Sequence, residues 1–313
     1  MHGRAEKCDG SPVFRPLSWH HLRRTAHFLL GVTIFGVGQV GAHAYEGPLH
    51  QQLTFIAVRH YNNCVTKDEL RLSALQARYM AKANVKQADG GFWRGLFRWN
   101  FYNRDDQKPR TWMWVVETRI HQGFEQLVGS LDRAESLADR YSNLGRVVNH
   151  LQDMTSPAHV VPVFASRWWR FNVGDRFDEF PIDEVALNQQ FGTDCAQVRG
   201  IIQDTMNVGY GELLRLTAER SFSAVKEDIE GLPSTWEVFW KPDENPGSFG
   251  EYGAAGNNFG RETAFKCANV RRPRCVMLND DPLYVDFARE RHLNAVQTTI
   301  AALARLQQLG AGG

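Results

Sequence analysis

The sequence lacks an excess of charge of either sign. It has 36 lysines and arginines against 35 aspartates and glutamates, a net charge of +1 over 313 residues. Without a basic excess the chain is not expected to bind a long polyanion by counterion release, which excludes a specific nucleic-acid-binding protein of the usual kind. The sequence also has no internal repeat, no low-complexity tract and no strong strand alternation. What remains is a mainly helical globular chain with few cysteines.

The first 44 residues are typical of a secretory signal peptide. A basic region precedes a short apolar run from Phe28 to Val40, and Ala42-His43-Ala44 follows as an A-x-A cleavage site. The apolar run is too short and too rich in glycine to suit a membrane span, although a single-pass anchor is the alternative. We therefore expect residues 1–44 to be removed and residues 45–313 to form one domain that is secreted or periplasmic.

Only five cysteines are present, and one of them, Cys8, falls in the expected leader. An even number in an exported chain favours two disulfides over four free thiols. Cys267 and Cys275 close a short loop, so they are expected to pair. Cys64 with Cys195 follows by elimination.

Apolar residues at helical spacing predict helices through most of the remaining chain, so the expected fold class is all-α. The predicted helices are His50–Asn62, Thr66–Ala83, Thr111–Ala138, Tyr141–Met154, Asp183–Val225 as two helices, and Asp286–Leu309. A capping-box pattern, Thr66 with Glu69, opens the second. Residues 98–110 and 231–282 are irregular. The latter is long for a loop, so it either covers a site or carries a small hairpin.

The segment Asn149–His159 gathers polar side chains of the kind that bind metals. If the predicted helix continues through Asp153, then Asn149 and His150 can share one of its faces with that carboxylate. Ser156-Pro157 ends the helix and directs His159 toward the same volume. Ligands from a helix and from the turn that ends it can form a metal cradle.

Two motifs resemble the zinc-dependent phospholipase C and single-strand nuclease superfamily. The opening of the expected mature chain, Tyr45-Glu46-Gly47-Pro48-Leu49-His50, is similar to the start of that family. The spacing Asn149-x3-Asp153-x5-His159, with Pro157, is similar to the main signature of that family. The sequences that flank this motif resemble those of the family's bacterial members. The resemblance spans roughly Tyr45 to Phe180. It implies a single helical domain of this type.

The resemblance also implies a set of metal ligands and two catalytic carboxylates. Up to three Zn²⁺ ions would be held by Tyr45, through its amino and carbonyl groups, and by His50, Asp89, Asn100, Asn149 or His150, Asp153, His159, Asp175 and Asp178. In this arrangement Asp153 bridges two metals. Asp89 serves as ligand or as the base that orients the attacking water.

The chain departs from the family pattern at two ligand positions, because Asn100 and Asn149 stand where the family has histidine. An amide oxygen is a poor zinc donor beside imidazole but suits harder cations. Three interpretations follow. The site binds zinc weakly or takes another divalent cation; His150, one residue away, replaces Asn149; or the site is empty and its chemistry is lost.

The resemblance implies an exported hydrolase that cleaves phospholipid head groups with a metal-activated water. Its expected partners are a phospholipid or other phosphodiester substrate and, transiently, a membrane surface, with the protein itself a monomer. A single-strand nuclease or nucleotidase is the alternative within the class. Outside that class stands a degenerate member that binds phosphate or a protein without turnover.

Overall fold

The structure is a computed structural model that describes eleven stretches of the chain. They are residues 47–67, 70–88, 101–102, 111–112, 116–117, 121–161, 163, 174–192, 194–246, 248–267 and 274–311. All of them belong to one unit, Val40–Gly313. The expected signal peptide, its cleavage site and Tyr45 lie outside the described residues.

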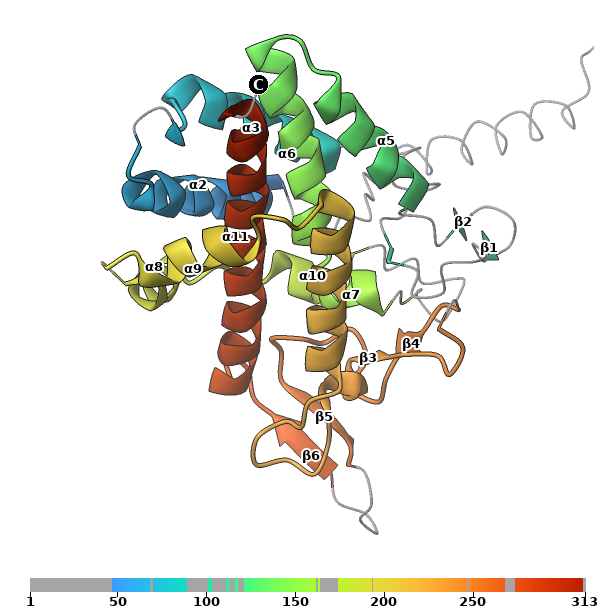
Figure 1. The fold of residues 1–313 in the computed structure, drawn as a ribbon. Helices are drawn as coiled ribbons and strands as arrows, with labels where there is room; N and C mark the ends of the chain where they lie inside the picture. The colour runs from blue at the N-terminus through green and yellow to red at the C-terminus, as the bar shows by residue number, and fades with distance from the viewer. Residues whose placement is uncertain are drawn as a thin grey trace, which may run out of the picture. The chain divides into compact units, whose positions relative to one another are not determined.

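Helices make up most of the described residues, as the sequence predicts (Figure 1). In chain order they are α2 (Gly47–Cys64), α3 (Ala74–Ala88), α5 (His121–Asp132), α6 (Leu137–Asp153), α7 (Pro157–Val160), α8 (Glu184–Phe191), α9 (Ala196–Asp204), α10 (Tyr210–Val225) and α11 (Pro282–Ala311), with short 3₁₀ turns η2 (Arg176–Glu179) and η3 (Trp236–Val238). The long helix α11 packs against α2, α6 and α10, and α6 packs against α3 and α5. The all-α class is therefore confirmed, while the specific family fold remains a prediction.

Two helix predictions differ from the structure. Helix α3 begins at Ala74, not at Thr66. Its capping box lies seven residues beyond the predicted one, with Gln76 N donating to Ser73 Oγ and Ser73 N donating to Gln76 Oε1. The predicted pair of helices over Asp183–Val225 is three, α8, α9 and α10.

The single long helix predicted over Thr111–Ala138 is wrong. The segment contains a two-stranded antiparallel pair, β1 (Thr111–Trp112) with β2 (Val116–Glu117), followed by α5. Its first half, Thr-Trp-Met-Trp-Val-Val, is rich in aromatic and β-branched residues, which favour a pleated backbone over a helix.

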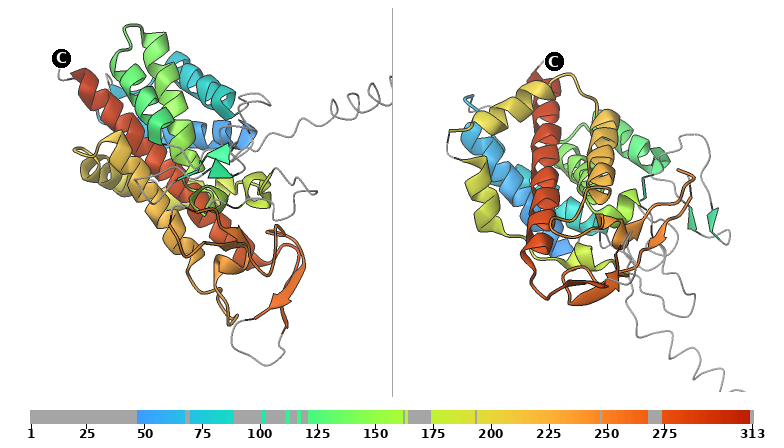
Figure 2. Two further views of the ribbon diagram at one scale, coloured as in Figure 1. Left: turned by 90° about the vertical axis from the view of Figure 1, so that its right-hand side faces the viewer. Right: turned by 90° about the horizontal axis from the view of Figure 1, so that it is seen from below.

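The irregular segment 231–282 carries hairpins, one of the two outcomes expected for it. Strand β3 (Trp240–Lys241) pairs with β4 (Glu251–Tyr252), and β5 (Thr263–Lys266) pairs with β6 (Arg274–Met277), both antiparallel. The β5–β6 hairpin lies beyond the N-terminal end of α11, away from the C-terminus (Figures 1 and 2).

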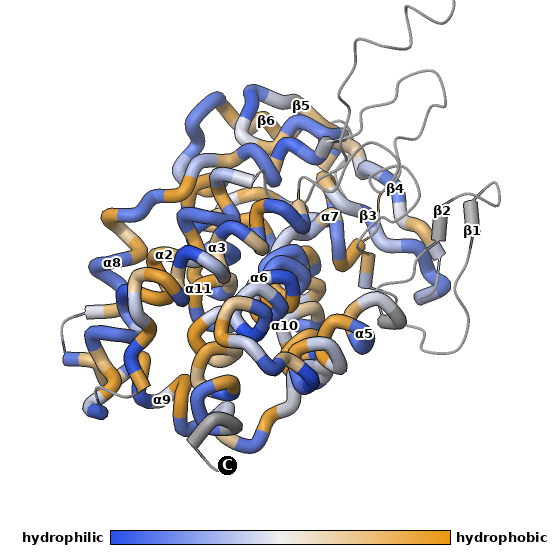
Figure 3. The backbone as a smooth tube through the Cα atoms, turned by 90° about the horizontal axis from the view of Figure 1, so that it is seen from above, coloured by the Kyte–Doolittle hydropathy of each residue, from blue (hydrophilic) through white to orange (hydrophobic). Residues whose placement is uncertain are grey.

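The core is formed by the apolar faces of the helices. Hydrophobic and hydrophilic residues alternate along each helix (Figure 3), so that one stripe turns inward. On α11 that stripe includes Val296, Ile300 and Leu303, all fully buried. The sequence predicts these three residues on one stripe of that helix.

Helices α3 and α6 approach closely at a glycine. A β-carbon at Gly145 would lie 2.2 Å from the backbone oxygen of Met80, so only glycine allows this separation. One turn further along each helix, Asn84 and Asn149 are hydrogen-bonded to each other. The close packing of two helices thus positions a buried pair of amides.

Both expected disulfides are present, Cys64–Cys195 and Cys267–Cys275. The first joins the C-terminal end of α2 to the start of α9, and the second links β6 to the residue that follows β5. Disulfides are typical of an oxidising compartment. Among the described residues no helix is long and apolar enough to cross a membrane.

The two disulfides are expected to contribute unequally to stability. They join residues 131 and 8 positions apart. From loop-closure entropy, replacing Cys64 and Cys195 with alanine is expected to lower the free energy of unfolding by about 5 kcal/mol, against about 2.5 kcal/mol for Cys267 and Cys275. Urea unfolding of the two double variants measures the difference. Equal losses would show that loop length does not govern their contributions.

Candidate functional site

A cluster of buried polar side chains lies where α2 meets the C-terminal half of α6. His50 on α2 and Asn149, Gln152 and Asp153 on α6 are at most 2% exposed. These residues face one another because Asn149 and Asp153 are four apart on α6, so both point toward α2. The structure thus brings together three predicted site residues, His50, Asn149 and Asp153.

A chain of hydrogen bonds from α11 fixes the orientation of the Gln152 amide. Thr299 Oγ1 donates to Ala295 O at 2.7 Å and therefore accepts from Gln152 Nε2 at 3.1 Å. Gln152 Oε1 must then be the acceptor that faces His50 Nδ1, 2.7 Å away. It follows that His50 carries a proton on Nδ1 and presents Nε2 to the rest of the cluster.

The Asn149 amide is oriented in the same way. Asn84 Nδ2 donates to Thr54 Oγ1 and to Gln152 Oε1, so Asn84 Oδ1 is an acceptor. Asn149 Nδ2 donates to that oxygen at 3.0 Å and lies 3.1 Å from His50 Nε2. Asn149 Oδ1 is buried and has no hydrogen-bond partner among the described residues.

Among the described residues, His50 Nε2 lies close to two groups with opposite requirements. The Asn149 amide nitrogen, a donor, is satisfied by a lone pair on Nε2. Asp153 Oδ1, an acceptor 3.2 Å from the same nitrogen, is satisfied only by a proton or another positive charge there. Neither protonation state of His50 satisfies both of these described neighbours. A cation at Nε2 would satisfy Asp153 and would require the Asn149 amide nitrogen to move away.

The histidines around Asp153 favour its charged form. Burial alone would raise the pKa of Asp153. The contact with His50 and the positive charges that His50, His159 and His150 can carry outweigh burial and hold that pKa below its ordinary value. A carboxylate at 2% exposure that stays ionised among imidazoles is suited to attract a cation.

His150 lies on α6 but outside the amide network. Its ring packs edge-on against Phe124 at 5.9 Å between centroids, and its Nδ1 is buried without a hydrogen-bond partner among the described residues. Burial lowers the pKa of His150, although the charge of Asp153 opposes that shift. A neutral imidazole can bind a metal ion. His150 therefore stays, beside Asn149, one of the two predicted ligands for this position.

His159 lies on α7, which begins after the Ser156-Pro157 break that the sequence predicts. It is 2% exposed, and its ring is tilted against Phe101, 5.8 Å away. Tyr102 N also donates to His159 O at 2.8 Å. Phe101 and Tyr102, the two residues that follow the predicted ligand Asn100 in the chain, thus lie against α7.

Asp175 and Asp178 lie at η2, below the same end of α6. Asp178 accepts a hydrogen bond from Ser156 Oγ at 2.6 Å, and burial together with the charge of Asp175 raises its pKa well above the ordinary value. Asp175 accepts from Trp240 Nε1, Tyr252 OH and Phe177 N, and burial raises its pKa. Both carboxylate oxygens of Asp175 are occupied by these hydrogen bonds, two of which come from the β3–β4 hairpin. Asp178 is therefore the better-placed ligand of the two.

Three predicted site residues, Tyr45, Asp89 and Asn100, lie outside the described residues. Within the described residues no group of three or more His, Cys, Asp or Glu side chains is arranged to hold a metal ion. A metal centre at Asp153 would therefore need amide donors such as Asn149 or ligands from outside the described ranges.

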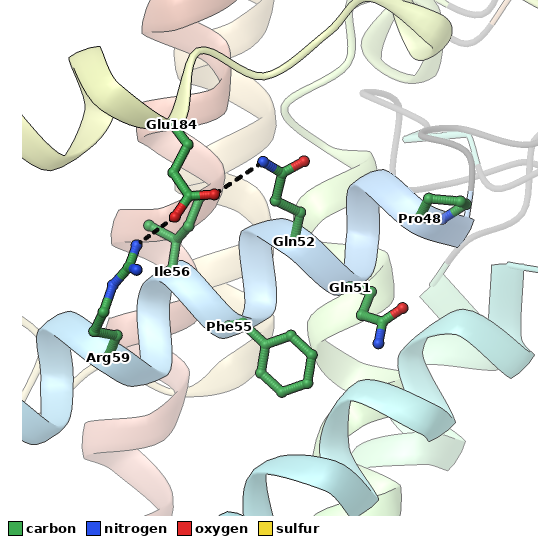
Figure 4. Close-up of a pocket in the computed structure, with 7 residues that line it drawn as sticks. All are labelled: Pro48, Gln51, Gln52, Phe55, Ile56, Arg59 and Glu184. Carbon is green, nitrogen blue, oxygen red and sulfur yellow. Dashed lines mark hydrogen bonds and ion pairs between the residues drawn. The ribbon is translucent and has the colours of Figure 1, made fainter.

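A hollow of about 310 Å³ on the outer side of α2 is separate from this cluster (Figure 4). Its rim is held by an ion pair between Arg59 and Glu184, and Gln52 also donates to Glu184. Phe55 contributes an apolar side chain to the lining. None of the predicted ligands lines this hollow, so it is not part of the candidate site.

The sequence analysis missed the residues that orient His50 and Asn149, which are Asn84, Gln152, Thr54 and Thr299. Gln152 follows Asn149 by three positions, and that helical spacing is the one signal that identifies it as a member of the same face. The others come from α2, α3 and α11, and no local pattern links them.

No family model, curated protein or solved structure matches the chain. The resemblance to the zinc phospholipase C family therefore rests on sequence motifs, chiefly those at Tyr45–His50 and Asn149–His159.

Proposed function

We propose that the chain is an exported, metal-dependent phosphodiesterase of the phospholipase C type, acting on phospholipid head groups. One observation carries this proposal: a buried Asp153 whose pKa is held below its ordinary value lies 3.2 Å from His50 Nε2, an imidazole nitrogen that could bind a cation together with it. A cation held between the imidazole and the carboxylate would satisfy Asp153, once the Asn149 amide nitrogen has moved off His50 Nε2.

The residues present fit a cation in their donor chemistry. His50 Nε2 supplies an imidazole nitrogen, Asp153 a carboxylate and Asn149 a buried oxygen without a partner among the described residues. Gln152 accepts the Nδ1 proton of His50, the arrangement that usually supports a metal-binding histidine from behind. The mixed set suits zinc at His50 and a harder cation, such as Ca²⁺, Mg²⁺ or Mn²⁺, next to Asn149.

The remaining ligands of the proposal come from the family resemblance. Tyr45 would add its freed amino group two residues before α2 begins, and Asp89 would follow the last residue of α3. His159 and Asp178 would hold a second ion near α7. When bound, such ions would neutralise the phosphodiester and lower the pKa of a bound water. Asp89 would orient that water or accept its proton.

A second candidate is a non-catalytic member of the family that binds a phosphorylated ligand or a protein. One contact favours it: Asn149 Nδ2 donates to His50 Nε2, the nitrogen that a metal would need. If this amide is never displaced, His50 is a structural residue and the site has no turnover.

Removal of divalent cations is expected to separate these candidates. Protein that begins at Tyr45 should hydrolyse phosphatidylcholine, lose at least about 100-fold in rate after treatment with a chelator, and recover on addition of Zn²⁺ or Ca²⁺. Phosphate release from the lipid and metal content by mass spectrometry are the measurements. Faster cleavage of single-stranded DNA would indicate the nuclease. Metal-free protein that is equally stable and inactive on both substrates would support the non-catalytic candidate.

A further inference from the structure

The β5–β6 hairpin has a face that the rest of the described chain does not cover. Residues on its inner face, such as Phe265 and Met277, are buried, as expected for a strand pair packed on a core. Its outer face carries Val276, and Leu278 follows in the same alternation. Their side chains are 47% and 60% exposed.

The same outer face is basic. Lys266 and Arg274 lie directly opposite each other in the hairpin register, and neither has an acidic partner among the described residues. Like charges in opposite positions destabilise a strand pair, so an unpaired cationic pair here has a cost that folding alone does not explain.

The sequence between the two strands is also basic. Between Cys267 and Cys275 the sequence adds Arg271 and Arg272, and no acidic residue occurs from Thr263 to Asn279. In the sequence, the nine residues from Lys266 to Arg274 thus carry four positive charges and no negative one, in a chain whose overall net charge is only +1. Of these four, Lys266 and Arg274 are the two that the structure places on the outer face of the hairpin.

We propose that the outer face of the β5–β6 hairpin binds the surface of an anionic phospholipid bilayer. The basic side chains complement anionic head groups, and Val276 and Leu278 insert at the boundary of the acyl region. A single-stranded nucleic acid is a poorer match, because the hairpin's aromatic residue, Phe265, faces inward and offers no surface for base stacking. The proposal deepens the proposed phospholipase function, on which it rests for its physiological meaning.

The test is sedimentation of the protein with vesicles of phosphatidylcholine alone or with 30% phosphatidylserine. Binding is expected only with phosphatidylserine and should weaken strongly at about 0.5 M salt, where charges are screened within a few ångströms. Lys266→Gln with Arg274→Gln should reduce the partition coefficient about 25-fold, since each basic residue contributes about fivefold. Val276→Ser with Leu278→Ser should reduce it on the order of tenfold.

Matched controls make the same changes elsewhere. Arg78→Gln with Lys82→Gln removes two exposed charges from α3, and Leu75→Ser with Val185→Ser removes two exposed apolar side chains. Both controls should bind vesicles like the unmodified protein, and circular dichroism should show every variant folded. Equal losses in the control and hairpin variants, or tighter binding to single-stranded DNA than to vesicles, would overturn the proposal.

Hydrolysis of a monomeric short-chain phosphatidylcholine keeps the two proposals separate. The hairpin variants should cleave this soluble substrate at the unmodified rate and lose activity only on anionic vesicles. Vesicle binding without hydrolysis of either substrate would contradict the phospholipase and leave the hairpin assignment intact. Hydrolysis without vesicle binding would contradict the hairpin assignment and leave the phospholipase proposal intact.

Discussion

Asp153→Asn is expected to remove most bound metal and to reduce phosphodiesterase activity by about 100-fold or more. The substitution keeps the size of the side chain but removes the negative charge that lies 3.2 Å from His50 Nε2. Because the site is buried, no water can substitute for that charge, and a neutral amide is a weaker ligand than a carboxylate. Metal content and the rate of phosphatidylcholine hydrolysis measure the two effects.

The matched control is Asp204→Asn, the same chemical change at an exposed residue at the end of α9. It should leave both metal content and activity unchanged. If Asp153→Asn retained its full metal content, the carboxylate would not be a ligand, and the buried cluster would have to be interpreted as a structural polar network.

Gln152→Met is expected to change the tautomer of His50. In the unmodified protein the Gln152 oxygen accepts the Nδ1 proton, so nitrogen-15 spectra of metal-free protein should show His50 protonated on Nδ1. Methionine is similar in length but offers no comparable acceptor, so the Nδ1-protonated form should lose its preference. Metal affinity should fall 10- to 100-fold, as for other residues that support a ligand from behind.

Two further variants separate orientation from packing. Gln152→Glu keeps an acceptor oxygen and should retain the Nδ1-protonated form of His50. Gln51→Met makes the same glutamine-to-methionine change at an exposed site on α2, and it should change neither the tautomer of His50 nor the metal affinity. A Nε2-protonated His50 in the unmodified protein would show that the hydrogen-bond chain from Thr299 does not determine the tautomer.

The sequence predicts helices well where apolar spacing is long and regular, as in α6 and α11. It fails where local composition competes with spacing. Thr111–Val116 contains helical apolar positions, but its aromatic and β-branched side chains favour strands. At α3, two capping patterns lie seven residues apart, and nothing local shows that the residue capping the helix is Ser73 and not Thr66.

Part of the candidate site was predictable because it lies on one helix and the turn that follows. Asn149, Asp153 and His159 are linked by short spacing, and His50 was proposed from its position relative to the expected cleavage site. The residues that set their orientation could not be predicted in this way. Asn84 and Thr299 come from α3 and α11, and their hydrogen bonds depend on how separate helices pack.

The close approach of α3 and α6 at Gly145 has a consequence for variation among relatives of this chain. The hydrogen bond between Asn84 and Asn149 lies four residues after the contact between Met80 and Gly145 on each helix. The distance between the two helix axes therefore governs both contacts. Alanine at position 145 would push the backbones apart and stretch the amide pair, although it touches no ligand. We therefore expect this position to resist substitution as strongly as Asp153, and its invariance in an alignment would report helix spacing, not chemistry.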